Sequence, residues 1–208
     1  MKARISFVLF LCSLLTALIG CGGKTPPAAE EVRKPVSSIV VLPVTIQKSE
    51  QGYDYITTRQ LEAGAAVLEE LAKELLAERT DIRFLTAAGI DSLLGDFLGT
   101  PKEMVRRIGE QSGADATLAI TAIRFSERDG GEYSVNQPAS VSFRYELTHV
   151  ESGATLCLGV FDETQQTLLS NLFTFSKASS RGFKWITARQ LAREGMQEKF
   201  NDCRYLAR

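Results

Sequence analysis

The sequence of 208 residues contains little of what side-chain catalysis requires. It has a single histidine, His149, at the end of an expected strand, and no nucleophile pattern lies beside it. The motifs GxSxG, SxxK, HExxH and CxxC and the phosphate-binding P-loop are all absent. Asp162 and Glu163 follow an expected strand and, as neighbours, would point to opposite faces, which makes them a poor acid–base pair. We therefore predict a non-enzyme with no catalytic residue, no metal site and no cofactor.

A strongly basic surface is also missing. Lys2 and Arg4 are two of the 24 cations and stand in the first 20 residues, which hold none of the 25 carboxylates. Without those residues, 22 cations face 25 carboxylates, so no basic field for nucleic acid is present. The polar run Asp162–Gln166 is interpreted as a solvated loop with a helix cap, and a recognition loop is the alternative.

The apolar run near the start, Ile5–Ile19, is shorter than the roughly 20 residues that span a bilayer. Its basic start and the small Gly20 at its end are typical of a cleavable signal peptide, residues 1–20. The segment Leu18-Ile19-Gly20-Cys21 resembles the bacterial lipobox. That resemblance implies a diacylglycerol thioether on Cys21, cleavage before it, and an amine acylated by a fatty acid such as palmitate. An ordinary signal peptide with a chance cysteine is the alternative.

The residue after Cys21 bears on localisation. By resemblance to the sorting rule of enterobacterial lipoproteins, Gly22 in place of aspartate implies the outer membrane, with the protein facing the periplasm. Two or three acyl chains hold a protein on a bilayer without a spanning helix. We expect a lipid-anchored protein.

Cysteine is scarce, with four in the chain. Cys12 leaves with the predicted signal peptide and Cys21 is used by the predicted lipid, which leaves Cys157 and Cys203. In an oxidising periplasm these two can form a disulfide. Alternatively, Cys157 is a small buried hydrophobe within an apolar strand.

Three regions follow from the composition: residues 1–20 as signal peptide, 21–37 as lipidated cysteine and flexible tether, and 38–208 as a single α/β domain. The apolar, β-branched run 38–44 predicts a central strand covered on both faces. Leucines at helical spacing predict a helix over 57–79. We expect an α/β fold, a mixed sheet with helices packed on it, that ends in a C-terminal antiparallel meander and a closing helix. The remaining expected elements are a strand at 82–85, helices starting at Thr86 and Thr100, and strands at 116–125, 141–148 and 156–160.

One segment occurs twice. Residues 52–61 read GYDYITTRQL and residues 182–191 read GFKWITARQL. Thr57 and Thr187 would be N-caps, each with a glutamine three residues on and an Ile–Leu hydrophobic staple. Helix initiation explains Ile, Thr, Gln and Leu, but it does not require the aromatic residues or the arginine. The alternative is a partner-binding patch, for which two lead-ins lying side by side would supply the following residues: Tyr53, Tyr55, Arg59, Phe183, Trp185 and Arg189.

The order of elements and three short segments resemble a known group of lipoproteins. The segments are Ile39-Val40-Val41-Leu42-Pro43-Val44, Gly113-Ala114-Asp115 and Thr148–Leu156. The chain resembles, over roughly Ser38–Phe161, the superfamily shared by the curli-secretion lipoprotein CsgG, the TolB amino-terminal domain and the peptidoglycan-synthase activator LpoB. No site residue of those families maps onto this sequence.

The chain departs from the curli channel between Arg124 and Pro138. A membrane-inserting hairpin needs long strands with one apolar face, but this stretch contains Arg128, Asp129 and two glycines. We therefore expect a non-enzymatic binding or adaptor module that contacts the membrane through its lipid and binds another envelope protein. The alternative is a homo-oligomeric structural or secretion-accessory lipoprotein of the curli type.

Overall fold

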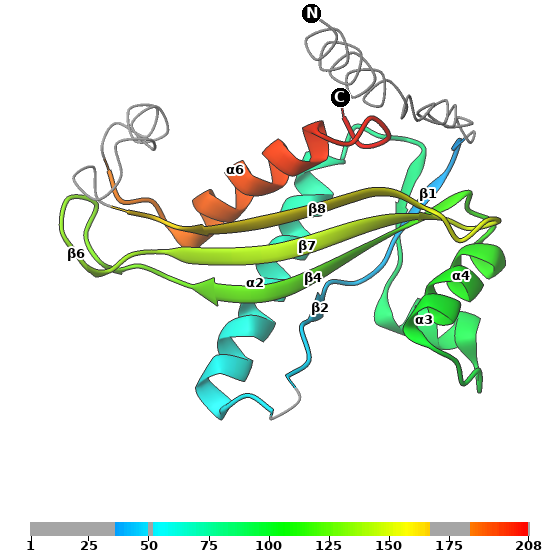
Figure 1. Ribbon diagram of the computed structural model, residues 1–208, viewed down its shortest axis with the longest axis horizontal. Coiled ribbons are helices and arrows are strands. Elements are labelled where there is room, and N and C mark those ends of the chain that lie inside the picture. The colour runs from blue at the N-terminus through cyan, green and yellow to red at the C-terminus, as the bar shows by residue number, and fades with distance from the viewer. Residues whose placement is uncertain (1–35, 50–51, 167–183, 208) are drawn as a thin grey trace, which may run out of the picture. The chain divides into compact units, whose positions relative to one another are not determined.

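A mixed sheet is the centre of the structure, a computed structural model (Figure 1). Its strands lie in the order β3-β1-β4-β7-β8, and β2 pairs with β4 beyond the end of β1. A separate two-stranded ribbon joins β5 and β6. The strands are β1 (Ile39–Val41), β2 (Thr45–Ile46), β3 (Ile82–Phe84), β4 (Ala116–Ser126), β5 (Asp129–Gly130), β6 (Val135–Gln137), β7 (Ser140–His149) and β8 (Thr155–Thr164).

The structure describes residues 36–49, 52–166 and 184–207. These all belong to the compact unit Pro35–Arg208. The predicted signal peptide, Cys21, all but the last two residues of the predicted tether, and Phe183 lie outside the described residues.

The parallel part of the sheet is formed by β1 between β3 and β4. All three residues of β1 are buried, which confirms the prediction of a strand covered on both faces. The predicted strand 38–44 is wrong in its extent, because it stops at Val41 and pairing resumes at Thr45. Pro43 lies in the gap, where its missing N–H cannot donate to a neighbouring strand.

The antiparallel part is the meander β4-β7-β8. Val141, Phe143, Tyr145 and Leu147 alternate along β7 and point into the core. β8 is longer than predicted: Asp162, Glu163 and Thr164 belong to the strand, so their assignment to a loop is wrong. The reason is tertiary, since three residues of β7, Ser140 to Ser142, pair with Asp162 to Thr164 past the point where the apolar pattern of β8 ends. The mixed sheet and terminal meander confirm the predicted fold class.

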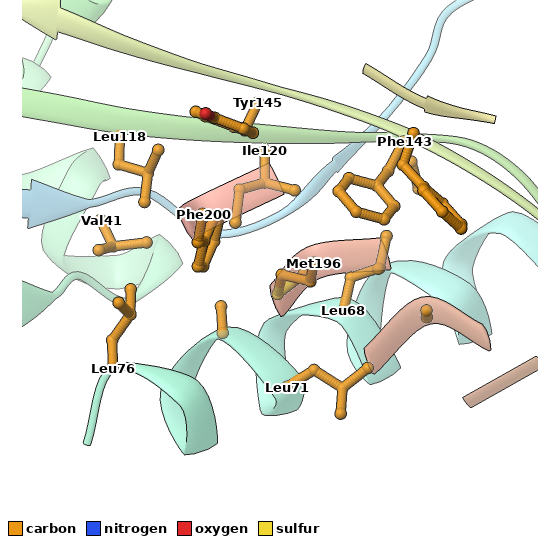
Figure 2. Packing of buried hydrophobic residues seen from close by; sticks show 14 of the residues in the cluster. Val41, Leu68, Leu71, Leu76, Leu118, Ile120, Phe143, Tyr145, Met196 and Phe200 are labelled. Atoms are coloured by element: carbon orange, nitrogen blue, oxygen red, sulfur yellow. The ribbon is translucent and has the colours of Figure 1, made fainter. Parts of the chain in front are cut away.

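Two helices, α2 (Tyr55–Leu75) and α6 (Ala188–Asn201), pack on the same side of the sheet. Figure 2 shows Leu68 and Leu71 of α2 and Met196 and Phe200 of α6 beside the apolar side chains of the strands. Each such fully buried side chain contributes roughly 1.5–3 kcal/mol to folding. The Tyr145 hydroxyl, at the edge of this core, donates to the carbonyl of Lys199 at 2.9 Å, and burial raises the pKa of Tyr145.

The other two described helices form a hairpin, α3 (Ala87–Leu94) and α4 (Pro101–Ser112). Thr86 caps α3, and Thr100 with Glu103 forms a capping box on α4, both as predicted. Gly113 ends α4 with φ +66°, a left-handed conformation that favours glycine. α4 then leads directly into β4.

Candidate interaction surfaces at the two helix starts

The first copy of the repeated segment begins α2 earlier than predicted. Asp54, and not Thr57, is the N-cap: its carboxylate accepts hydrogen bonds from the backbone N–H of Thr57 at 3.0 Å and from the Thr57 hydroxyl at 2.6 Å. Aspartate is as good an N-cap as threonine or better, and it comes first along the chain. The prediction for Thr57 is therefore wrong, and Thr57 lies inside the first turn.

This early start exposes the side chains that follow Asp54. Tyr55 is 75% exposed and Ile56 is 68% exposed. The guanidinium of Arg59 lies 6.0 Å from the centre of the Tyr55 ring. Tyr53, by contrast, is half-buried and packs against the core. We call Tyr55, Ile56 and Arg59 the α2 surface.

The second copy begins α6 as predicted. Thr187 is the N-cap, its hydroxyl accepts from Gln190 N–H at 3.2 Å, and the Gln190 side chain accepts from Thr187 N–H at 3.0 Å. Ile186 is 8% exposed and belongs to the same core cluster as Leu191. These residues are at the positions of a hydrophobic staple. Helix initiation thus accounts for four of the shared residue types here.

The aromatic lead-in of α6 is used inside the fold. The Trp185 backbone N–H donates to the carbonyl of Glu132 at 2.7 Å, and the Arg128 guanidinium donates to the Trp185 carbonyl. From the other side, the Gln165 amide donates to the Lys184 carbonyl at 2.8 Å and accepts from Ile186 N–H at 2.9 Å. Hydrogen bonds to Arg128 and Glu132 on one side and to Gln165, just after β8, on the other therefore fix the backbone of this segment.

Gln165 is a structural residue that sequence reasoning missed. It is buried, although it stands in a run of polar residues that predicts a solvated loop. Both ends of its side-chain amide are hydrogen-bonded, as a buried polar group requires. No local signal in the sequence identifies a glutamine whose partners stand about 20 residues away.

Arg189 also has partners within the molecule. Its guanidinium contacts Glu70 at 2.7 Å and Glu74 at 2.5 Å, both on α2, and the hydrogen bond that it donates to Glu70 raises the pKa of Arg189. Fifteen helical residues separate Tyr55 from Glu70, a rise of about 22 Å. The structure therefore does not bring the two lead-ins together into one patch.

A polar cavity of about 430 Å³ adjoins the start of α6. Its ion pairs are Lys184 with Glu132, at 2.9 Å, and Arg193 with Glu74 of α2. The contact with Glu132 raises the pKa of Lys184 and lowers that of Glu132. Both shifts favour the charged forms, so Lys184 and Glu132 form an ion pair and are not poised to exchange a proton. The cavity is lined by Arg128, Glu132, Lys184, Trp185, Ile186, Thr187, Gln190, Arg193 and Glu194.

Cys157 and Cys203 are joined by a disulfide, with their Cα atoms 5.8 Å apart. Cys157 belongs to β8, and Cys203 follows the end of α6. The bond therefore ties an edge strand of the sheet to the C-terminal segment.

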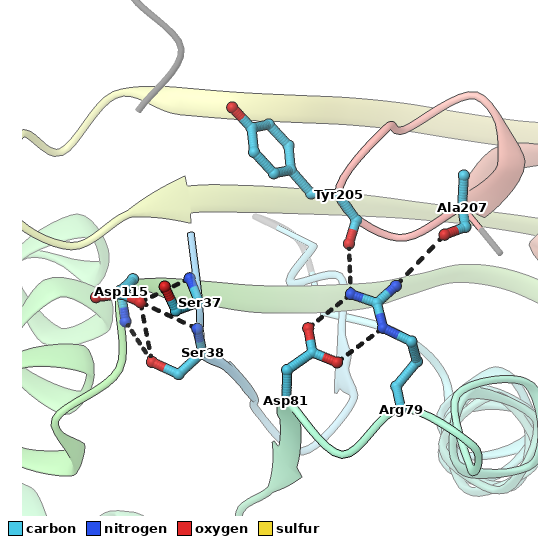
Figure 3. Close-up of polar contacts among 7 residues, drawn as sticks. All are labelled: Ser37, Ser38, Arg79, Asp81, Asp115, Tyr205 and Ala207. Atoms are coloured by element: carbon cyan, nitrogen blue, oxygen red, sulfur yellow. Dashed lines mark hydrogen bonds and ion pairs between the residues drawn. The ribbon is translucent and has the colours of Figure 1, made fainter. Parts of the chain in front are cut away.

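Two polar clusters hold the ends of the described domain (Figure 3). Asp115 accepts from the backbone N–H groups of Ser37 at 2.8 Å and Ser38 at 3.0 Å, and the bond from Ser37 lowers the pKa of Asp115. Arg79 forms two hydrogen bonds to Asp81 and also donates to the carbonyl of Tyr205 at 3.0 Å. The first cluster holds the point where the chain enters the domain, and the second holds the C-terminal segment.

His149 is placed at the end of β7, as predicted, and is buried. Its Nδ1 accepts from Ser152 N–H at 3.3 Å and lies 2.9 Å from the Ser152 hydroxyl, so it closes the β7–β8 turn. Within the described part of the chain, no cluster of three or more histidine, cysteine or acidic residues could hold a metal ion. The helices of that part include none with the length and apolar character of a membrane span.

Comparison with known proteins gives similar solved structures, while no family model and no curated protein matches the chain. The PelC dodecamer from Paraburkholderia phytofirmans aligns with 13% identity and a TM-score of 0.48, over 83% of this chain and 89% of that chain. The LpoB C-terminal domain from Escherichia coli gives 16% and 0.40, over 74% and 94%. Lipoprotein GNA1162 from Neisseria meningitidis gives 17% and 0.38, over 71% and 96%.

LpoB, which the sequence resembles, is thus among the solved structures that match, whereas the link to CsgG and TolB stays a prediction. Identities below 20% and TM-scores below 0.5 assign no function to this chain.

Proposed function

We propose that this chain is a non-enzymatic lipoprotein adaptor that binds another protein of the bacterial envelope through the α2 surface. Cys21 carries the lipid, residues 21–37 form the tether, and residues 38–208 form one domain on the periplasmic side of the outer membrane. The observation that carries the binding proposal is the exposure of Tyr55 and Ile56 next to Arg59. Tyrosine and arginine are residue types enriched at the energetic centres of protein interfaces.

The contrast with α6 supports this choice of surface. Arg189 is held by Glu70 and Glu74, and the backbone of Trp185 is fixed by Arg128, which follows β4, and by Glu132 of the β5–β6 turn. Among its described interactions, the α2 surface forms no comparable contact with another element, and Arg59 stacks on Tyr55 within α2 itself. A membrane-anchored partner would meet it at high effective concentration, so a modest affinity is sufficient.

The test is photo-crosslinking in intact cells from a photoreactive residue at position 55, with position 185 as the matched control. We expect one envelope protein to be captured at position 55 and not at position 185. Arg59→Ala should remove the adduct at position 55, and Arg189→Ala should leave it. Equal capture at both positions, or a position-55 adduct that survives Arg59→Ala, would reject the α2 surface.

A homo-oligomer is the second candidate, and the edge strand β8 favours it. Within the described residues, no strand pairs with the outer edge of β8, and Leu158 and Val160 are exposed on the side opposite to Phe161. Open edges of this length can pair with a second copy. Sedimentation of the purified mature protein in detergent separates the candidates, because a protein that remains monomeric contradicts the oligomer.

A further inference from the structure

The α3–α4 hairpin buries several of its apolar side chains only in part. Helix α3 reads AAGIDSLL, and none of its eight residues is fully buried, whereas α2, α4 and α6 each bury at least two. Its principal neighbour is α4. An apolar helix in a folded domain ordinarily buries its apolar face, so part of the apolar surface of this hairpin is left uncovered.

The exposed apolar surface is concentrated where α3 turns toward α4. Leu98 is 96% exposed, and Leu94 and Phe97 are half-buried. The Phe97 N–H donates to the Leu94 carbonyl at 3.0 Å, which brings these residues into one turn. We call Leu94, Phe97 and Leu98 the hairpin tip.

A cation flanks the hairpin tip. The guanidinium of Arg107 lies 5.4 Å from the centre of the Phe97 ring. Long basic side chains beside aromatic and aliphatic residues are typical of surfaces that meet lipid head groups. Residues 86–112 hold three cations and four carboxylates, so the attraction cannot be mainly electrostatic.

We propose that the hairpin tip inserts into the interface of the lipid bilayer to which the protein is anchored. This inference rests on the proposed lipidation of Cys21. Even fully extended, the 17 residues Cys21–Ser37 reach at most about 60 Å, so the domain cannot leave the neighbourhood of the bilayer. Such confinement corresponds to a millimolar effective concentration, at which a small apolar contact is well populated.

The experiment uses the mature lipoprotein reconstituted in vesicles of phosphatidylethanolamine and phosphatidylglycerol that contain a lipid with a spin label on its acyl chain. A fluorophore is attached at Leu98→Cys, and Ile56→Cys is the matched control because Ile56 is also an exposed aliphatic residue. The native Cys157 and Cys203 are joined to each other, so the introduced thiol is the one that reacts. We expect severalfold stronger quenching at position 98 than at position 56, and the same ratio without phosphatidylglycerol.

The outcomes separate this inference from the proposed function. Protein that floats with the vesicles but shows equal quenching at both positions overturns the insertion and leaves the anchor standing. Protein that does not float overturns the anchor and the insertion with it. A label at position 98 can also be shielded from water without being quenched by the lipid. If that shielding increases with protein density, a second copy covers the tip, and the insertion is overturned.

Discussion

Residues 52–61 and 182–191 are the two copies of one sequence, and they differ most at their shared isoleucine. Ile56 is 68% exposed, whereas Ile186 is 8% exposed. In α2, Ile56 is helical and stands five residues before the buried Leu61, which places it about 140° away around the helix axis. In α6, Ile186 precedes the N-cap and is free to fold back toward Leu191.

A single substitution between the copies accounts for this difference. Asp54 can accept the hydrogen bonds of a helix start, whereas Lys184 at the equivalent position has only donors. The helix therefore starts at Tyr55 in one copy and at Ala188 in the other, three residues later in the repeat. The position of the cap, more than the apolar pattern, decides which side chains become surface.

The largest expected effect concerns the isoleucines. Ile186→Ala should lower the free energy of unfolding by about 2–4 kcal/mol, because it removes buried methyl groups and leaves a cavity. Ile56→Ala should change it by less than about 0.5 kcal/mol, because the side chain is in water. Urea unfolding of the two variants measures the difference, and equal losses would show that the copies are packed alike.

The threonines test the caps themselves. Thr187→Ala should cost about 1 kcal/mol of stability, because it removes the N-cap hydroxyl of α6. Thr57→Ala should cost only a few tenths of a kcal/mol of stability, because Thr57 is not the cap.

The Asp54→Lys background sharpens the threonine comparison, because Thr57 should then become the cap. Thr57→Ala should there become as costly as Thr187→Ala, which urea unfolding of the single and double variants measures. A Thr57→Ala cost that is unchanged in this background would contradict the role of Asp54.

The smallest expected effect is a pH dependence confined to the first copy. The Thr57 hydroxyl, followed by its backbone N–H, lowers the pKa of Asp54. The stabilisation by Asp54 is therefore complete above its unfolded pKa of about 3.9 and is lost as the pH falls through the lower folded value. The protection of the Thr57 amide against exchange, relative to the unfolded chain, should fall in acid, while that of Gln190, which is capped by a hydroxyl, should show no matching change.

Asp54→Asn is the control for this titration, since it keeps a cap oxygen but cannot ionise. Its Thr57 amide should exchange without the acid-dependent step. Persistence of that step in Asp54→Asn would assign the titration to another carboxylate.

Much of the fold could be predicted because its signals are local. The capping box of Thr100 and Glu103, the alternation along β7 and the apolar run of β1 depend on residues within a few positions of one another. The antiparallel meander follows from the short Glu151–Gly153 turn. These signals define the elements and most of their order.

The candidate site was less accessible to sequence reasoning. Asp54 and Thr57 are both good caps, and the repeat favours the shared Thr57 rather than Asp54, which differs between the copies. Gln165 takes its role from backbone groups of Lys184 and Ile186, and Arg189 takes its partners from α2. Such long-range pairings leave no pattern in the sequence around either residue.

The disulfide between Cys157 and Cys203 determines what a protease can release from this domain. Helix α6 lies entirely within the loop of chain that the bond closes. A single cut anywhere between the two cysteines therefore leaves both pieces covalently joined, and α6 stays attached to the sheet that it covers. Such a nicked molecule would run as one band on a non-reducing gel and as two bands after reduction, so the cleavage would be detected only once the disulfide is reduced.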